Sequence, residues 1–239
     1  MWVAGSPRGT VAELHALDLP VDGRGVHLMD ATRPTIVLGS AQAESLVDPA
    51  AASAAGWDVT RRRTGGGLVA LDPDEVIWID LMVPLGDPLW HPDVVRAFDW
   101  VGRAWADALR DVGLSVEVAT ATPAADRDLG RVVCFASTGA GEVLLDGRKL
   151  VGISQRRTRA GARFQCLVHR RWQPERWWPL VAGGLAALDG VTRDDPGSRP
   201  GGLADRLDRR LRSGVAVIDH IGVDPDSLVE RLVERLPTC

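Results

Sequence analysis

The chain has 239 residues, a net charge of −4, 45% hydrophobic residues and 25% charged residues, which is ordinary for a globular protein with a full core. The negative charge argues against bulk nucleic-acid binding, and no apolar run approaches the roughly 18 to 20 residues needed to span a membrane. The N-terminus lacks a basic segment followed by an apolar stretch. Cys134, Cys166 and Cys239 are widely spaced and odd in number, which disfavours a disulfide framework. We therefore expect a cytoplasmic protein.

The first half of the chain predicts alternating strands and helices. Residues 33–42 contain a short β-branched run that ends in Gly-Ser, which predicts a strand and a turn. Asp48 and Pro49 are a suitable N-cap and first-turn pair for a short helix ending near Gly56, after which a strand leads into three arginines. Residues 75–84 predict an apolar strand. Residues 92–114 have apolar side chains at spacings of three and four, which predicts an amphipathic helix.

The second half begins with a predicted strand at 114–120 and a polar loop at 121–130. We then expect four strands, at 132–137, 141–145, 148–157 and 162–172, and Asp146-Gly147 is a strong hairpin-turn signal. A Trp-rich segment at 174–188 and a Pro/Gly/Asp linker at 194–202 follow. Two amphipathic helices are predicted near 203–212 and 225–236.

Strands and helices interleave without a regular β-α-β period. The predicted class is therefore α+β, with a mixed or antiparallel sheet and flanking helices. We predict a main domain over residues 1–190 and a short helical C-terminal extension over residues 191–239.

The first candidate site is the segment RRRTGGGLVALD, residues 61–72. Consecutive glycines leave backbone N–H groups accessible, and the preceding arginines add positive charge, so the segment suits a carboxylate or phosphate. The candidate binding residues are Arg62, Arg63, Gly65, Gly66 and Gly67. The alternative is a flexible turn that follows a solvated charge run. A Walker A loop is excluded because the single lysine of the chain follows an arginine.

The second candidate site is the strand that contains Lys149, the only lysine among 28 Lys and Arg residues. A composition that replaces lysine by arginine could leave one lysine by chance. A narrow pocket, however, accepts a compact ammonium and refuses a planar guanidinium. Period-two alternation puts Gly152 and Ser154 on one face of the strand, and Lys149 and Gln155 on the other. Gly152 indicates the close approach of a ligand or a neighbouring backbone.

The remaining signals are weaker. Cys134 lies in an apolar run and is either a small core residue or a thiolate nucleophile assisted by Lys149. The five histidines form no cluster, and no Cys-x-x-Cys or His-x-x-x-His spacing occurs, so we expect no metal site. The basic stretch from Arg156 to Arg176 is either a solvated face or a docking surface for an acidic partner or a nucleotide.

Taken together, RRRTGGGLVALD and GEVLLDGRKLVGISQRR resemble the two signature segments of the lipoate-protein ligase and octanoyltransferase family. The likeness covers roughly residues 33–172 and implies the catalytic fold shared with biotin-protein ligases. It implies attachment of a lipoyl or octanoyl group to a lysine of a lipoyl carrier domain, of the glycine cleavage H protein or 2-oxoacid dehydrogenase E2 type. By this resemblance Lys149 reaches the reacting carbonyl or α-phosphate, and the glycine loop, Gly152, Ser154 and Gln155 line the acyl and nucleotide pocket.

The resemblance leaves three functions open. A ligase would use ATP with Mg²⁺ to activate free lipoate or octanoate as an acyl-adenylate, and the glycine loop slightly favours this route. An octanoyltransferase would take the acyl group from acyl carrier protein through a thioester on Cys134 and need no cofactor. A non-catalytic relative would only bind acyl groups or lipoyl domains, as the Leu71-Asp72 pair in place of the family's His-Asp suggests. We expect neither nucleic acid nor a membrane as a partner.

Overall fold

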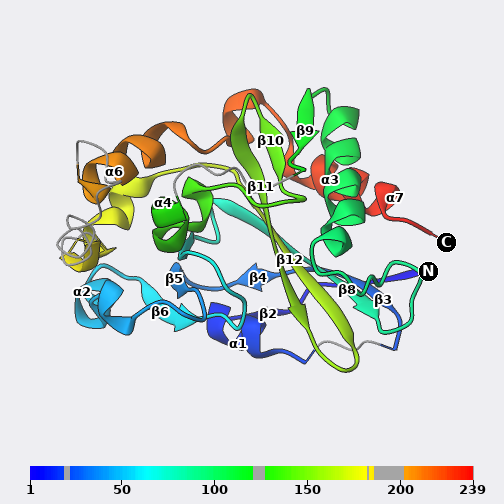
Figure 1. Ribbon diagram of the computed structural model, residues 1–239, viewed down its shortest axis with the longest axis horizontal. Coiled ribbons are helices and arrows are strands. Elements are labelled where there is room, and N and C mark those ends of the chain that lie inside the picture. The colour runs from blue at the N-terminus through cyan, green and yellow to red at the C-terminus, as the bar shows by residue number, and fades with distance from the viewer. Residues whose placement is uncertain (19–21, 121–126, 182, 186–201, 239) are drawn as a thin grey trace.

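The computed structural model describes residues 1–18, 22–120, 127–181, 183–185 and 202–238. Its centre is a seven-stranded mixed sheet with the order β1-β3-β8-β12-β11-β10-β9 (Figure 1). β1 and β3 are parallel, and the other neighbouring pairs are antiparallel. The strands are β1 Trp2–Gly5, β3 Arg24–Leu28, β8 Val76–Pro84, β9 Val116–Val118, β10 Val143–Leu145, β11 Arg148–Arg157 and β12 Gly161–His169. The predicted mixed sheet with flanking helices is confirmed.

Two smaller sheets accompany the main one. A three-stranded sheet has the order β6-β5-β7, and a two-stranded sheet pairs β2 with β4. Their strands are β2 Arg8–Gly9, β4 Asp30–Ala31, β5 Thr35–Leu38, β6 Asp58–Arg61 and β7 Val69–Leu71. The sequence predicted β5 and β6 but not β2, β4 or β7, because short strands carry too few residues for a period to be seen.

The helices lie on both faces of the main sheet. One face is covered by α3 (Asp99–Asp111) and α7 (Pro225–Arg235). The other face packs against α1 (Val11–Ala16), β5 and β7. A third apolar cluster joins β5 and β7 to α2 (Pro49–Ala54), α4 (Arg127–Val132) and α6 (Leu203–Ser213). The three-stranded sheet therefore lies between the main sheet and these three helices.

The hairpin between β10 and β11 confirms its turn signal. Asp146 and Gly147 both have left-handed backbone angles, with φ values of 51° and 70°, as a type I′ two-residue turn requires. β11 and β12 then form the long hairpin that crosses the centre of the molecule (Figure 1). This hairpin positions both the Lys149 end of β11 and the small residues further along it.

Three local predictions are wrong. Residues 132–137 are not a strand, because only Val133 forms a bridge, to Leu68, and Cys134–Ala136 is a 3-10 turn. Phe135 and Ala136 are buried in different clusters, so the segment is packed on both sides. Part of the predicted loop at 121–130 is α4, which begins at residue 127. The helix predicted from residue 92 begins only at Asp99, after a 3-10 turn.

The C-terminal helices pack on the rest of the fold. The predicted ranges 203–212 and 225–236 correspond to α6 and α7. The segment after α6 pairs with the lysine strand, since Lys149 N donates to Gly214 O at 3.3 Å and Ala216 N donates to Lys149 O at 2.9 Å. The linker at 194–201 and the predicted boundary between residues 190 and 191 lie outside the described residues.

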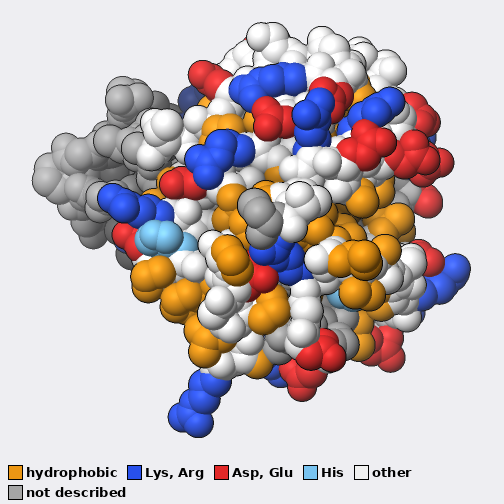
Figure 2. All heavy atoms as spheres, turned by 90° about the vertical axis from the view of Figure 1, so that its right-hand side faces the viewer, with side chains coloured by type: hydrophobic (Ala, Val, Ile, Leu, Met, Phe, Trp, Pro, Cys, Tyr) orange, Lys and Arg blue, Asp and Glu red, His pale blue; other side chains and the backbone are white. Residues whose placement is uncertain are grey.

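Both termini lie on the same side of the molecule (Figure 1). Trp2 Nε1 donates to Pro237 O at 2.8 Å, and this bond joins the first strand to the C-terminal tail. The face that carries the termini shows hydrophobic side chains among charged ones (Figure 2). Within the described part of the chain, no helix combines the length and apolar character needed to cross a bilayer.

The packing of α7 on α3 predicts a large difference between two neighbouring residues. Leu232 is fully buried in the main core, whereas Val233 is 41% exposed. We expect Leu232→Ala to lower the free energy of unfolding by about 2–5 kcal/mol because it leaves a cavity. Val233→Ala is expected to change it by no more than about 0.5 kcal/mol. Urea unfolding of both variants checks this, and equal losses would contradict the packing described.

Candidate active site

The first signature segment lies against the turn that contains Cys134. Leu68 N donates to Val132 O at 2.9 Å, and Cys134 N donates to Leu68 O at 2.9 Å. The end of the glycine loop is thereby paired, backbone to backbone, with the turn that carries Cys134. The sequence could not place these segments together, because some 65 residues separate them and the 132–137 run does not extend as a strand.

The three glycines have different roles. Gly65 has open space where a Cβ would lie, and Gly66 has a φ of 94°, which an L side chain rarely adopts. A Cβ on Gly67 would lie 2.6 Å from Cys134 N and 2.7 Å from Val133 C. Gly67 is therefore required for the close approach of the loop to the Cys134 turn, a role different from the predicted anion cradle.

The arginines before the loop also differ. Arg62 is buried, lines the cavity described below and donates from Nη2 to Gly67 O at 2.9 Å. Its Nε is buried with no hydrogen-bond partner among the described residues, so it is a donor that a ligand oxygen could satisfy. Arg63 is exposed and does not line the cavity.

Lys149 is almost completely buried, at 2% exposure. Its Nζ donates to Cys134 O at 2.8 Å and lies 2.9 and 2.8 Å from the two carboxylate oxygens of Glu142. The carboxylate of Glu142 also accepts from Ile153 N at 3.3 Å. Three oxygens surround the compact ammonium, a geometry that suits three N–H donors on one nitrogen better than a planar fork.

Sequence reasoning missed Glu142. It stands seven residues before Lys149, on the other arm of the hairpin, and nothing in its immediate sequence distinguishes it from a surface acid. The signal that could have found it is the need of a buried ammonium for a counter-ion. A register shift in the β10–β11 pairing between Val143 and Leu144 made its position harder to predict.

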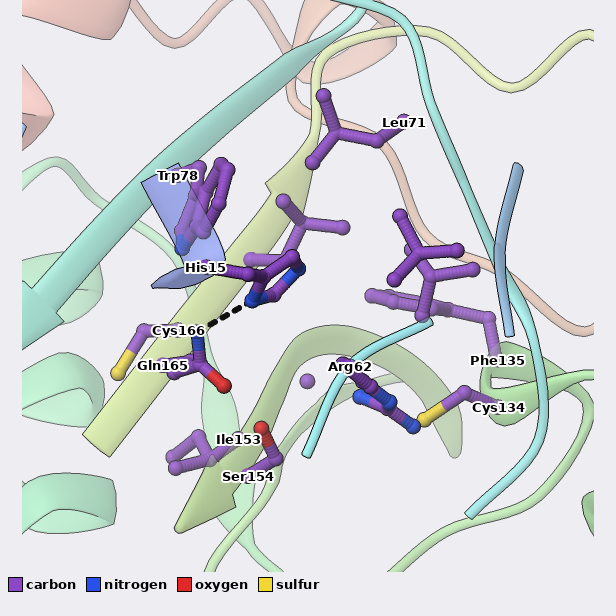
Figure 3. A pocket seen from close by; sticks show the side chains of 14 residues that line it. His15, Arg62, Leu71, Trp78, Cys134, Phe135, Ile153, Ser154, Gln165 and Cys166 are labelled. Carbon is purple, nitrogen blue, oxygen red and sulfur yellow. Dashed lines mark hydrogen bonds between the residues drawn. The ribbon is translucent and has the colours of Figure 1, made fainter. Parts of the chain in front are cut away.

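A mostly apolar cavity adjoins the Cys134 turn. Leu71 and Trp78 lie on one side of it, and Arg62, Cys134 and Ser154 lie on the other (Figure 3). The apolar part of the wall comes from the main sheet, the three-stranded sheet and the 3-10 turn. Its side chains are Val37, Val69, Leu71, Trp78, Phe135, Ile153 and Leu167. The arrangement suits an apolar chain with a polar head.

Of the four predicted site residues on β11, two line the cavity, and Lys149 and Gln155 do not. Gly152 and Ser154 are in its wall, and a Cβ on Gly152 would lie 2.9 Å from Phe135 Cζ. The group that approaches Gly152 closely is thus the Phe135 ring, whereas the sequence predicted a ligand or a neighbouring backbone. Gln155 does not line the cavity, and its Oε1 accepts instead from Arg157 Nε at 3.1 Å.

The two described cysteines of the wall differ in environment. Cys134 is half-buried, whereas Cys166 is fully buried and burial raises the pKa of its thiol well above the usual range. Cys166 therefore stays a neutral thiol and is unsuited to act as a nucleophile. Cys239 lies outside the described residues.

His15, which lines the cavity, is another site residue that the sequence did not reveal. It lies on α1 with its ring 4.8 Å from that of Trp78, and its Nδ1 is 3.0 Å from Gln165 Nε2 (Figure 3). Burial, followed by the charges of Arg163 and Arg62, lowers the pKa of His15 to about 3. The neutral imidazole can accept a hydrogen bond from the Gln165 amide.

The close contact at Gly67 gives a prediction with a matched control. Gly67→Ala should lower the free energy of unfolding by about 1–3 kcal/mol, because its methyl group meets backbone atoms that cannot move aside. Gly65→Ala should change it by no more than about 0.5 kcal/mol. The rate at which a small thiol reagent labels Cys134, followed by peptide mass, should change only in Gly67→Ala. Equal behaviour of the two variants would refute the role assigned to Gly67.

Buried His169 predicts a pH-dependent stability. Burial, and secondarily the charge of Lys149, lowers its pKa from 6.5 to about 3. Between these values the unfolded chain binds a proton that the folded protein does not, so the contribution of His169 is complete above pH 6.5 and is lost on acidification. His169→Phe keeps an aromatic ring beside Phe135 and Trp172.

The variant should reduce the slope of unfolding free energy against pH, between pH 6 and 4, by about 1.4 kcal/mol per pH unit. Urea unfolding at several pH values measures this slope. Parallel curves for the variant and the wild type would show that His169 does not titrate as described.

The profile of the family described as lipoyl protein ligase A/B catalytic domain matches residues 16–170. Octanoyltransferase LipM of Moorella thermoacetica is 33% identical over 125 residues, which are 52% of this chain and 45% of LipM. The chain thus matches less than half of the length of this relative.

Solved structures agree on the fold. The putative lipoate protein ligase Ta0514 of T. acidophilum superposes with a TM-score of 0.67 at 13% identity, over 98% of this chain and 82% of that one. A lipoate-protein ligase A bound with ATP has a TM-score of 0.67 at 14% identity, with the same two coverages. The resemblance inferred from the two sequence segments is confirmed: the chain belongs to the lipoyl protein ligase A/B catalytic-domain family.

Proposed function

We propose that this protein transfers an octanoyl group from an acyl carrier protein to a lysine of a lipoyl carrier domain, through a thioester on Cys134. The observation that carries the proposal is the position of Cys134. It is half-buried in the wall of the apolar cavity, on a turn whose backbone is held by Lys149. The likeness to octanoyltransferase LipM supports this choice.

The cavity has an apolar side and a polar side, which suit two different parts of the acyl donor. The octanoyl chain occupies the apolar side near Leu71 and Trp78, and the thioester lies at the polar side near Cys134. Arg62 Nε, the buried donor without a partner among the described residues, is available to the carbonyl oxygen as negative charge develops there. Lys149 fixes the Cys134 carbonyl and so orients the residue that attacks.

The reaction proceeds in two balanced steps. The Cys134 sulfur attacks the donor carbonyl, the bond to the carrier sulfur breaks, and the carrier leaves as a thiol with the proton that Cys134 gave up. The ε-amine of the acceptor lysine then attacks the octanoyl-Cys134 thioester. An amide forms, the bond to Cys134 breaks, and the amine proton returns to the cysteine sulfur.

The acceptor is proposed from the family and from one neighbour. An archaeal bipartite lipoate protein ligase from Thermoplasma acidophilum, whose structural study includes its E2 lipoyl domain, superposes with a TM-score of 0.66 at 14% identity. It covers 97% of this chain and 80% of that one. A lipoyl domain of the E2 or glycine cleavage H protein type is the acceptor that we propose here.

The ATP-dependent route, which the glycine loop slightly favoured, fits the cavity less well. Mg²⁺ prefers carboxylate and phosphate oxygens, and no Asp or Glu is present among the described residues that line this cavity. Glu142 is close, but both of its oxygens contact Lys149. The described lining therefore does not fit a magnesium ion, and no step is assigned to ATP.

The intact mass of a purified lipoyl domain, and of this protein, tests the proposal. With octanoyl carrier protein as donor, the lipoyl domain should gain one octanoyl group. Without the lipoyl domain, the protein itself should gain one, as a thioester cleaved by hydroxylamine. Cys134→Ala should abolish both gains, because no other half-buried thiol lines the described cavity, and Cys166→Ala is the control that should keep them.

Three other outcomes would contradict the proposal. Modification of the lipoyl domain from free octanoate or lipoate that requires ATP and survives Cys134→Ala would make the protein a ligase. Transfer from the carrier that survives Cys134→Ala would exclude the thioester. Binding of octanoate or of the lipoyl domain without any modification would make the protein a non-catalytic relative.

A further inference from the structure

One face of the β11–β12 pair changes from apolar to basic along its length. Three successive cross-strand pairs share this face: Gly152 with Leu167, Ser154 with Gln165, and Arg156 with Arg163. The first two pairs line the acyl cavity. The third lines a second hollow. Same-face positions of a strand are about 7 Å apart, so the hollow begins where the polar side of the acyl cavity ends.

The same continuity holds on the opposite wall. His15 lines the acyl cavity, and Leu17 and Asp18, the next residues along this segment, line the hollow. The two spaces therefore lie end to end between α1 and the β11–β12 hairpin. A ligand with its acyl chain in the cavity would extend past Ser154 into the hollow.

The two arginines of the hollow have different partners. Arg163 contacts the Asp80 carboxylate through Nε and donates from Nη2 to Leu14 O at 2.8 Å, so it is committed to the protein. Arg156 is half-buried and has no hydrogen bond or ion pair within the described ranges. Arg156 is therefore the guanidinium available to a ligand.

A second available arginine lies nearby. Thr64 Oγ1 is 3.5 Å from Ser154 Oγ, so the glycine loop meets β11 at this point, and exposed Arg63 directly precedes Thr64. Burial, followed by the like charge of Arg63, lowers the pKa of Arg156, whereas Asp18 raises it. Arg63, too, has no carboxylate within ion-pair distance in the part of the chain that is described.

Three surface arginines on α3 and α7, by contrast, are paired with carboxylates. On the face formed by α3 and α7, positive and negative side chains lie next to one another (Figure 2). The pairs there are Arg110 with Asp107, Arg231 with Glu234, and Arg235 with Asp111. The two guanidinium groups repel each other, Asp18 offsets part of this repulsion, and a bound anion would remove more of it.

We propose that the hollow binds the phosphodiester of the phosphopantetheine arm of the acyl carrier protein, with Arg156 as its direct contact and Arg63 at its rim. This rests on the proposed function, since it assumes a carrier-bound acyl donor. The acyl chain fills the cavity, the thioester lies at Cys134, and the arm leaves along Ser154 toward the two arginines. The acceptor lysine carries no phosphate, so the charge of the hollow distinguishes donor from acceptor.

The test compares two donors with three variants that remove a charge and with Arg156→Lys, which keeps it. The donors are octanoyl carrier protein and octanoyl-N-acetylcysteamine, a short thioester without a phosphate. The variants are Arg156→Gln, Arg63→Gln and, as control, Arg159→Gln, which removes the same charge from an exposed residue that lines neither space. Initial rates of octanoyl-Cys134 formation give kcat and KM, and thermal unfolding verifies that each variant is folded.

We expect Arg156→Gln to raise KM for the carrier about tenfold or more, as loss of a charge-assisted hydrogen bond implies. Its effect on the short thioester should be several-fold smaller. Arg63→Gln should raise the carrier KM less, Arg159→Gln should match the wild type with both donors, and Arg156→Lys should recover part of the loss. The dependence of carrier kcat/KM on ionic strength should be weaker in Arg156→Gln.

Equal losses of Arg156→Gln with both donors, or no loss with the carrier, would overturn the inference while leaving the proposed function intact. If the wild type forms no octanoyl-Cys134 from either donor, the proposed function fails and the inference fails with it. A selective loss in Arg156→Gln of modification that depends on ATP would assign the hollow to a nucleotide phosphate instead, and would also overturn the inference.

Discussion

The architecture of the site depends on one buried ion pair, between Lys149 and Glu142. Both side chains are nearly inaccessible to solvent, at 3% and 5% exposure, and an unpaired charge at such a depth would be strongly destabilising. The pair must therefore form whenever the fold forms. Lys149 also donates to the carbonyl oxygen of Cys134, and the Glu142 carboxylate also accepts from Ile153 N. One electrostatic requirement thus connects the hairpin, the 3-10 turn and the cavity wall.

Helix α1, which lies opposite the β11–β12 hairpin, is held by a second buried ion pair, between Arg163 and Asp80. α1 has only six residues, too few to be stable alone. Its first turn is closed by a capping box between Thr10 and Glu13, and Arg163 binds carbonyl oxygens at its end. Burial raises the pKa of Asp80 to about 6, and the charge of Arg163 opposes this rise. The hydrogen bonds from Arg163 keep His15 over the cavity. β12 contains Arg163 and also forms the part of the cavity wall that faces His15.

The strongly patterned elements could be predicted from the sequence, and the weakly patterned ones could not. The apolar strand β8 and the hairpin with Asp146-Gly147 have a clear period or a turn that only certain residues accept. The apolar run around Cys134 has neither. It is buried on both sides, and burial on both sides removes the alternation that separates a strand from a turn. α4 contains Gly130 and polar residues, and its helix depends on packing of Leu129 rather than on propensity.

The sequence by itself determined the fold class, the hairpin and the two segments that contain Lys149 and Gly67, because these depend on local pattern and on residue types with few substitutes. Only the tertiary structure decided which groups meet them. Glu142 approaches Lys149 across a hairpin with an irregular register, and His15 meets Gln165 from 150 residues away. Such partners meet because buried charges and polar groups must be paired in space. This requirement produces no regular spacing along the sequence.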